Sequence, residues 1–570
     1  MKYIKGEDRR QYAFLPACLD EYIEQDNPVR YIDAAVEKLD LEELGFTHTY
    51  RVTPGKGGRP PYDPSDMLKL LIYGCFNSIR SSRKLEKACR MNIEVKWLLN
   101  NVTPDFRTIS DFRKDNTSAI KQVFKSVNKQ LDSLGLFSHS YISIDGSKFK
   151  AVNSKDNNFT LNKLDDRISR LEEHEHQYLD ELEKNDFDDN RTFSREETER
   201  KLLECQKRKS KYEGYRTQLE QSGEKQLSLT DPDSKLMKFN DGFNVGYNVQ
   251  TGIEADSHLI ATYNVTTNPT DHGEITETIP DVKETLGHDI VEVVADKGYQ
   301  DPTDIAKALA SGIVPNVIQR DGGNVTEVEF SYCETEISDE MLNSKDPTDI
   351  EACLKAGRVP QVYAGILDSA NIMERKFYQS VAPSVLKTMS DGEMQDLARH
   401  GYFVRDAAKN LVYCPQGHIL RQKSIKKDGR IRYCNKLACK KCSCRCTSSP
   451  FKEADFSKDT LIMKAKNYQV ESDSNQSDNH PSAPMDKKRR EVTVRKVVTY
   501  KLHLDQNKMA QRKCLSEHPF GTMKRSLGAY YFLLKTKVKV EAEMALICLS
   551  YNLRRAISML GVPQLVAKMA

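Results

Sequence analysis

Strand-like and helical segments alternate between residues 141 and 318, and this alternation restricts the fold more than any other feature of the sequence. Residues 141–152 alternate in polarity and carry β-branched side chains, which is typical of a strand. The pattern then predicts strands at 243–251, 257–266, 290–295 and 313–318, with helices at 272–286 and 301–311. The apolar segment 290–295 is typical of a strand at the centre of a sheet. We therefore expect an α/β domain.

Two aspartates occupy strand positions where ligands commonly bind. Asp145 lies in the first strand, and Asp296 directly follows the strand at 290–295. Ligands gather at the carboxyl ends of strands, so the two carboxylates converge if their strands are neighbours. Taken alone, either aspartate is more often a turn or cap residue. The order of the elements is that of an RNase H-like mixed sheet, and converging carboxylates are typical ligands of Mg²⁺ or Mn²⁺.

Helical segments flank and interrupt this sheet. Residues 1–137 are expected to form an all-α domain, with continuous helices at 79–100 and 110–136. Residues 161–222 are highly charged with apolar positions at helical spacing, which predicts an inserted antiparallel hairpin serving as a spacer or dimerisation element. Helix returns from residue 508, and 541–560 is expected to be strongly amphipathic.

The stretch 321–507 has an irregular texture and is expected to be an insertion subdomain, with disorder near 470–490. It contains a cluster of cysteines whose spacing is typical of a zinc ribbon. The preferred ligand set is Cys414, Cys439, Cys442 and Cys446; Cys434, Cys444 and His418 are substitutes. The alternative is a reduced loop without metal.

Charge and hydropathy give weaker constraints. The 86 basic residues nearly cancel the 83 acidic ones, giving a net charge of +3. Lys and Arg nevertheless dominate 421–445, 487–496 and 508–525, as expected for surfaces that contact a phosphate backbone. The N-terminus lacks an apolar signal core and no apolar run of about 18 residues occurs, so we expect a cytoplasmic protein outside the membrane.

Several long segments resemble bacterial insertion-sequence DDE transposases, in the branch related to the IS-eleven-eighty-two type. The resemblance rests on residues 58–99, on TPDFRTISDFRKDN (103–116) and on SIDGSKFKAVNSKDNNFT (143–160). It continues through DPDSKLMK (231–238), GFNVGYNVQTGIEADSHLI (242–260) and VVADKGYQD (293–301). It ends with SEHPFGTMKRSLG (516–528) and AEMALICLSYNLRR (542–555).

The resemblance implies that Asp145, Asp296 and Glu517 are the catalytic carboxylates and bind magnesium. The family pattern Y-x2-R-x3-E-x6-K places Lys524 two helical turns after Glu517, where it would contact DNA phosphate. Here Ala510 replaces the tyrosine and Lys513, beside Arg512, replaces the arginine, so the upstream basic contact is open. We expect DNA contacts from Arg512, Lys513, Lys524 and Arg525. Glu541 and Glu543 are alternatives to Glu517, while Asn268 and Asp271 support the site, contact DNA, or serve as turn and cap residues.

The resemblance further implies an enzyme that cuts insertion-sequence ends and joins their 3′-hydroxyls to target DNA. Its partners would be double-stranded DNA, both inverted repeats and target, and a second copy in a homodimeric synaptic complex associated with the bacterial nucleoid. Residues 1–137 would bind the DNA ends through Arg80, Arg83, Arg90, Arg107 and Arg113. Residues 138–320 and 508–570 would form the catalytic domain. The alternatives are an inactive transposase-derived DNA-binding protein and another RNase H-like nuclease.

Overall fold

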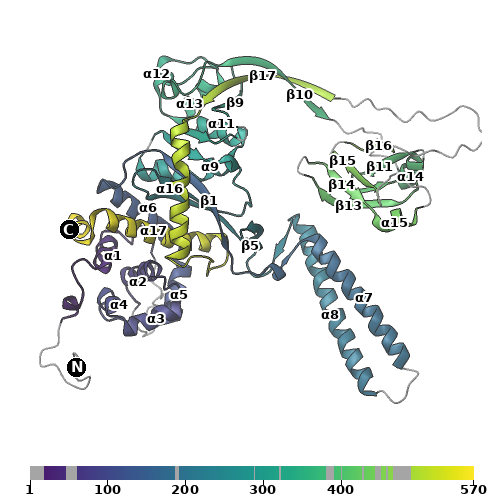
Figure 1. Cartoon of the computed structure of the whole chain (residues 1–570), viewed down its shortest axis with the longest axis horizontal. Coiled ribbons are helices and arrows are strands. Elements are labelled where there is room, and N and C mark those ends of the chain that lie inside the picture. The colour runs from purple at the N-terminus through teal and green to yellow at the C-terminus, as the bar shows by residue number, and fades with distance from the viewer. Residues whose placement is uncertain are drawn as a thin grey trace, which may run out of the picture. The chain divides into compact units, whose positions relative to one another are not determined.

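The computed structural model describes residues 18–46, 61–185, 192–287, 289–319, 322–380, 390–399, 401–426, 429–442, 451–457, 460–465 and 490–569. They form two compact units (Figure 1). The first joins Met1–Asn371 to Val498–Ala570, and the second is Ile372–Val497. Both units contain helices and strands, which confirms the expected mixed α/β class.

Helices build the N-terminal part of the first unit. They are η1 (Leu19–Tyr22), α1 (Pro28–Glu37), α2 (Pro64–Phe76), α3 (Ser82–Met91), α4 (Ile93–Leu98), α5 (Phe106–Asp115) and α6 (Thr117–Ser133). At the start of α2, Pro64 fits the first turn and the side chain of Asp63 accepts a hydrogen bond from the Ser65 amide. Almost every residue of α2 is buried, so this helix forms the centre of the helical region.

The expected continuous helices over 79–100 and 110–136 are wrong, because an asparagine divides each of them. The Asn92 side chain accepts hydrogen bonds from the amides of Glu94 and Val95 and so starts α4. Asn116 separates α5 from α6, and its side-chain amide donates to the carbonyl of Phe112. Asparagine competes for the backbone hydrogen bonds of a helix, which explains why both helices end at these positions.

The centre of the first unit is a six-stranded sheet. Its strands are β1 (Ile142–Lys150), β4 (Lys235–Phe239), β5 (Gly242–Glu254), β6 (Ile260–Thr266), β7 (Val291–Ala295) and β8 (Ile313–Val317). The sheet runs in the order β4-β5-β1-β7-β8, and β6 also pairs with β5. The strands β1, β7 and β8 are parallel, whereas β5 is antiparallel to β1, β4 and β6. The sheet is therefore mixed, and β4 was not expected from the sequence.

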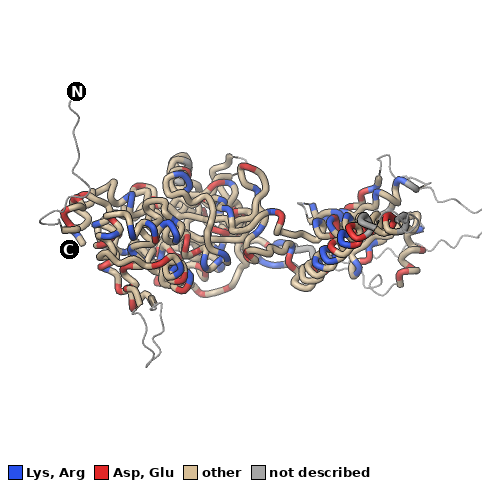
Figure 2. Tube along the Cα trace, turned by 90° about the horizontal axis from the view of Figure 1, so that it is seen from below, with Lys and Arg blue, Asp and Glu red and all other residues tan. Residues whose placement is uncertain are grey.

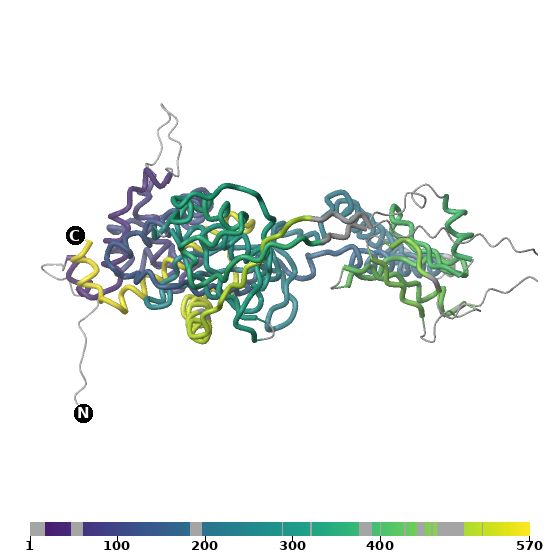
Figure 3. Tube along the Cα trace, turned by 90° about the horizontal axis from the view of Figure 1, so that it is seen from above, coloured from purple at the N-terminus to yellow at the C-terminus, as the bar shows by residue number. Residues whose placement is uncertain are grey.

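Further helices surround the sheet. They are α9 (Glu274–Thr278), α10 (Pro280–Leu286), η3 (Lys297–Tyr299), α11 (Pro302–Ala310), α16 (Gln506–Arg525), α17 (Lys537–Leu560) and α18 (Val562–Met569). Helix α16 contacts β1 and β7, while α17 contacts α2, α6 and β6. Helix α18 packs on α1, so the C-terminal helix lies beside the first helices of the chain (Figure 3). No helix within the described ranges is long and apolar enough to cross a membrane.

The expected amphipathic pattern of α17 is wrong, because every residue from Ala542 to Leu553 is buried. Helices α2, α6, α16 and α18 and the strand β6 pack against α17. Its polar Asn552 is satisfied within this core: the side chain accepts from the Ile260 amide at 2.8 Å and donates to Asn128 at 2.8 Å. This amide network ties α6 and α17 to the sheet.

An antiparallel hairpin of α7 (Leu161–Asn185) and α8 (Thr192–Ser222) follows η2 (Lys155–Asn157) and precedes β4. The short strands β2 (Asn158–Phe159) and β3 (Leu227–Ser228) pair at its base, where Phe159, Leu164 and Leu219 form a small core. Exposed ion pairs join the helices, including Lys209 with Glu172 and Glu175. Such pairs contribute little stability individually, so the basal core fixes the hairpin.

Residues 322–371 belong to the first unit. They contain β9 (Val325–Ser331), α12 (Asp339–Asn343), α13 (Pro347–Lys355) and η4 (Gln361–Tyr363), and lead into β10 (Asn371–Ser380). A three-stranded sheet runs in the order β10-β17-β9, in which β17 (Arg490–His503) leads back to α16.

The second unit contains a six-stranded antiparallel sheet, whose strands were not expected from the irregular texture of the sequence over 321–507. The sheet order is β15-β14-β13-β12-β11-β16. The elements are α14 (Asp391–Arg399), β11 (Tyr402–Asp406), β12 (Leu411–Tyr413), β13 (Ile419–Ile425), β14 (Ile431–Cys434), α15 (Lys436–Lys441), β15 (Glu453–Phe456) and β16 (Ile462–Lys464). Its strands are short, and most of β13 is exposed, so hydrophobic periodicity gave little signal. The disorder expected near 470–490 falls almost wholly outside the described residues.

The carboxylate of Glu254, at the end of β5, makes folding sensitive to acid. Burial alone would raise its pKa, but hydrogen bonds from Ser138, Ser140 and Ser257 outweigh burial and lower the pKa to about 2. A lowered folded-state pKa gives stability that is present above the ordinary pKa and lost as pH falls from about 4.5 toward 2. We predict that the free energy of unfolding falls less on acidification in Glu254→Gln than in the parent chain, by up to about 3 kcal/mol. Urea unfolding across that pH window measures the difference.

The exposed Glu224 provides the control. Glu224→Gln should retain the pH dependence of the parent chain. An unchanged pH dependence in Glu254→Gln would contradict the assignment.

Candidate active site

The register of β1 and β7 sets Asp145 beside Asp296. The two strands are parallel, with Ile142 opposite Val293 and Ser143 opposite Val294. Two residues further along the strands, the same register brings Asp145 opposite Asp296. The two aspartates therefore lie side by side at the level where β7 ends, and the carboxyl ends of parallel strands commonly present ligand-binding residues.

Asp271 joins these two aspartates, and two glycines make room for it. A Cβ atom added at Gly146 would lie 2.6 Å from the Asp271 Oδ1, and one added at Gly298 would lie 3.4 Å from its Oδ2 and 2.8 Å from the Asp296 Oδ1. A side chain at either position would therefore collide with a carboxylate. The glycines in the Asp-Gly and Asp-Lys-Gly sequences permit the approach of Asp271, which sequence reasoning left as either a site residue or a turn residue.

Amide side chains from β5 hold Asp271 in place. Its Oδ1 accepts hydrogen bonds from Asn248 Nδ2 and Gln250 Nε2, both at 2.8 Å. Gln250 also accepts a hydrogen bond from the buried hydroxyl of Tyr299. Asn268 has a separate, local role, because its amide donates to Glu274 at 2.8 Å. Asp271 therefore faces the site, while Asn268 stabilises the adjacent turn.

The pKa of Tyr299 also reflects the closeness of the three aspartates. Burial raises the pKa of this tyrosine well above its ordinary value, and the negative charges of Asp271, Asp145 and Asp296 raise it further. The tyrosine therefore stays protonated and serves as a hydrogen-bond donor beneath the three carboxylates.

Helix α16 carries basic side chains to β1. The guanidinium Nη1 of Arg512 lies 3.8 Å from the Asp145 Oδ1. Three turns later, the ammonium of Lys524 donates to Ser147 Oγ at 2.6 Å and to the Lys148 carbonyl at 3.0 Å. Burial lowers the pKa of Lys524, because its charged form is poorly solvated. Two of the expected DNA-binding residues, Arg512 and Lys524, thus extend from α16 to the strand that bears Asp145.

The remaining predicted residues of this helix have different surroundings. Glu517 and Arg525 are exposed on α16, and the side chain of Lys513 lies outside the described residues. The alternatives to Glu517 are engaged elsewhere. Glu541 pairs with Lys121 at 2.8 Å, and Glu543 is buried in an ion pair with Arg80.

The carboxylate oxygens are ligands that suit a hard divalent cation, but they do not by themselves form a complete coordination site. Asp145, Asp271 and Asp296 offer oxygen ligands, as Mg²⁺ and Mn²⁺ require. Among the described residues, no three His, Cys, Asp or Glu side chains lie close enough together to hold a metal ion. Further ligands from other residues, water or DNA would be needed to complete the coordination of a magnesium ion.

Three of the four expected zinc ligands line one cavity of the second unit. Cys414, Cys439 and Cys442 lie there together with His418. Cys414 belongs to the turn between β12 and β13, whereas Cys439 is in α15 and Cys442 directly follows it. Cys446 and the substitute Cys444 lie outside the described residues, and Cys434 ends β14. The fold thus gathers cysteines that are distant in sequence, although the full ligand set is not described.

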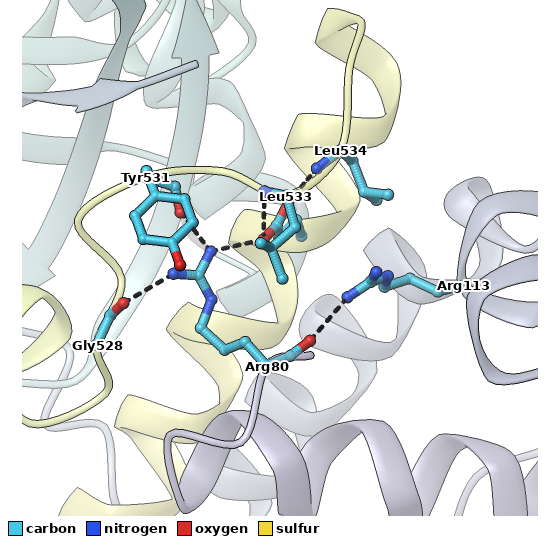
Figure 4. Close-up of polar contacts among 7 residues, drawn as sticks. Arg80, Arg113, Gly528, Tyr531, Leu533 and Leu534 are labelled. Atoms are coloured by element: carbon cyan, nitrogen blue, oxygen red, sulfur yellow. Dashed lines mark hydrogen bonds and ion pairs between the residues drawn. The ribbon is translucent and has the colours of Figure 1, made fainter. Parts of the chain in front are cut away.

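Two of the arginines expected on the DNA-binding surface are buried structural residues. Arg80 donates to the carbonyls of Gly528 and Tyr531 and forms an ion pair of 2.6 Å with Glu543 (Figure 4). Glu543 also accepts hydrogen bonds from the Leu533 and Leu534 amides. Arg113 is also buried and donates to the Arg80 carbonyl (Figure 4). The surface prediction is therefore wrong for Arg80 and Arg113.

Arg83, Arg90 and Arg107 are exposed and remain available to a ligand. Arg83 and Arg107 both lie over the ring of Phe106. Basic and acidic residues are interspersed along the chain (Figure 2), in keeping with the small net charge. Local basic surfaces must therefore provide any contact with phosphate.

Residues 17–115 match the family model described as Transposase domain (DUF772). The match covers helices α1 to α5 and supports a role for the chain as a transposase, the class of DNA-cutting enzyme that moves mobile elements. The match confirms the general expectation from the sequence, that of a transposase. No curated protein and no solved structure matches the chain.

We predict that Arg80→Met lowers the free energy of unfolding by about 3–5 kcal/mol, because it leaves the Glu543 carboxylate buried without its cation. The side chains of Arg80 and Glu543 are only 8% and 3% exposed. Urea unfolding measures the change. Arg90→Met is the matched control: its exposed pair with Glu86 should contribute less than about 1 kcal/mol. Equal stabilities for the two variants would contradict a structural role for Arg80.

Proposed function

We propose that this chain is a DDE transposase with an RNase H-like catalytic core, which cleaves DNA at the ends of an insertion sequence and joins the 3′-hydroxyls to target DNA. The observation that carries the proposal is the parallel register that brings Asp145, within β1, beside Asp296, which directly follows β7. The transposase-domain match in the N-terminal helices supports the same function independently.

In this proposal Asp145 and Asp296 hold divalent cations, with Glu517 as the third carboxylate. Bound Mg²⁺ would lower the pKa of an attacking water or 3′-hydroxyl and neutralise the leaving oxygen. Asp271 faces the same space, fixed by Asn248 and Gln250, and supplies further negative charge for the cations. The glycines at 146 and 298 let the carboxylates of Asp271 and Asp296 lie close to the backbone.

The basic residues of α16 would bind the phosphates near the cleaved bond. Because burial penalises the charged form of Lys524, an incoming phosphate would stabilise its ammonium group. Arg512 offers a planar guanidinium next to Asp145, suited to bidentate contact with phosphate. The exposed Arg525 follows Lys524 on the same helix and would extend this contact, together with Lys513.

Recognition of the element ends would fall to the N-terminal helices, through the exposed Arg83, Arg90 and Arg107. Two ends must be held together for joining, so we propose a homodimer as the synaptic complex. The buried Arg80 clamp would then fix the recognition helices to the part of the chain that follows Lys524.

In the second unit, Cys414, Cys439 and Cys442 are proposed as ligands of a structural zinc ion, completed by Cys446. The soft thiolates suit zinc rather than magnesium. A metal at this position would crosslink α15 and the β12–β13 turn of a small sheet whose core is limited.

We predict that Asp145→Asn lowers strand transfer by about 1000-fold or more, because the amide loses the charge that holds the cation. The assay uses the full-length chain, Mg²⁺ and a duplex carrying the inverted repeats that flank the coding region, with joined products separated on a gel. Asp156→Asn changes an exposed aspartate in η2 and is the matched control, expected to join as the parent does.

Joining by Asp145→Asn at the parental rate would refute the proposed active site. Loss of joining with unchanged binding to the repeats supports it. Glu517→Gln is expected to fail in the same assay. If it joins normally while Asp271→Asn fails, the third carboxylate is Asp271.

For the second unit we predict about one zinc ion per purified chain, lost in the double variant Cys439→Ser/Cys442→Ser. Elemental analysis by mass spectrometry measures the zinc content. Cys333→Ser, at an exposed cysteine of the first unit, is the control and should retain the metal. A parent chain without zinc would exclude the proposed metal site.

A further inference from the structure

A cleft of about 700 Å³ lies beside the carboxylates of the first unit. Gly146 and Asp271 form part of its wall, so the cleft opens directly next to the candidate active site. Its volume falls within the range of about 300–1,000 Å³ that is usual for sites binding small organic groups. The volume is therefore sufficient for a nucleotide.

The cleft combines positive charge with aromatic rings. Its described lining residues include four lysines and two aspartates. One of these aspartates, Asp241, forms an ion pair of 2.6 Å with Lys150. Lys524, the residue proposed to bind phosphate, is one of the four. The aromatic lining residues are Phe239, Tyr530 and Tyr531. Lysines beside accessible rings are the combination with which proteins bind single-stranded nucleic acid, because the bases stack while the backbone meets the cations.

Tyr530 is the ring best placed for stacking. Its side chain is 53% exposed, although the backbone around it is fixed: the Tyr530 carbonyl accepts from the Lys150 amide at 3.2 Å, and the Phe532 amide donates to the Lys150 carbonyl at 2.9 Å. Tyr531 has a structural partner, because the Arg80 guanidinium lies over its ring at 5.4 Å. An exposed aromatic ring on an anchored loop offers a preformed face to a ligand.

We propose that this cleft binds the unpaired nucleotides of the DNA strand next to the cleaved phosphate, with a base stacked on Tyr530. An unpaired base has a free face for the ring, whereas the bases of an intact duplex are already stacked on one another. The inference rests on the proposed function, because DNA must reach the carboxylates for its strand to enter the cleft.

The test measures fluorescence anisotropy of a labelled oligothymidylate of about eight nucleotides with the full-length chain. Tyr530→Ala should weaken binding by about 5- to 100-fold, since stacking on one aromatic side chain is lost. Tyr530→Phe keeps the ring and should bind within about 2-fold of the parent. Tyr22→Ala is the matched control, because Tyr22 is 58% exposed and belongs to η1, far from the cleft in sequence.

A second arm measures a blunt duplex carrying the flanking inverted repeats. Tyr530→Ala should bind this duplex as the parent does. Parental affinity of Tyr530→Ala for oligothymidylate, or equal weakening by Tyr530→Phe, would overturn the inference. If the parent binds the duplex but not oligothymidylate, the inference fails and the proposed function stands. If the parent binds neither, both fail.

Discussion

The parallel pairing of β1 with β7 is the constraint on which the candidate site depends. Without this register, Asp145 and Asp296, which are far apart in the sequence, would have no reason to lie side by side. The antiparallel partner β5 then adds Asn248 and Gln250, whose amides orient Asp271 toward both strands. Backbone hydrogen bonds between strands thus determine where negative charge accumulates, and the glycines at 146 and 298 allow the carboxylates to approach the backbone.

Buried polar contacts connect the N-terminal helices with the residues after α16. The guanidinium of Arg80 satisfies two carbonyls of this connection and the buried carboxylate of Glu543, which in turn accepts two backbone amides. Neither charge could remain buried alone. The connection continues to β1, where Lys150 hydrogen-bonds with Tyr530 and Phe532. Short polar contacts therefore connect the helical region with the strand bearing Asp145.

The sequence predicted the parts of the structure that local patterns determine. The strands around Asp145 and Asp296 carried β-branched alternation, and the charged hairpin carried helical spacing. Asparagine caps that divide helices were missed, because one polar residue scarcely alters hydrophobic periodicity. The burial of Arg80 was also missed. The sequence does not distinguish an arginine exposed on a helix from one that binds the carbonyls of a distant loop. Asp271 was left undecided, although glycines beside both catalytic-type aspartates were a signal that a third side chain approaches them.

The second unit leaves and rejoins the first at adjacent positions of one small sheet. The Thr499 hydroxyl donates to the Asn371 carbonyl at 3.2 Å, and the Asp368 amide donates to the Lys501 carbonyl at 3.0 Å. Because the exit and the return are neighbours, a short turn could close the chain there without removing any element of the central sheet. The second unit is thus a module that evolution can enlarge, exchange or lose while the framework of the aspartates stays intact.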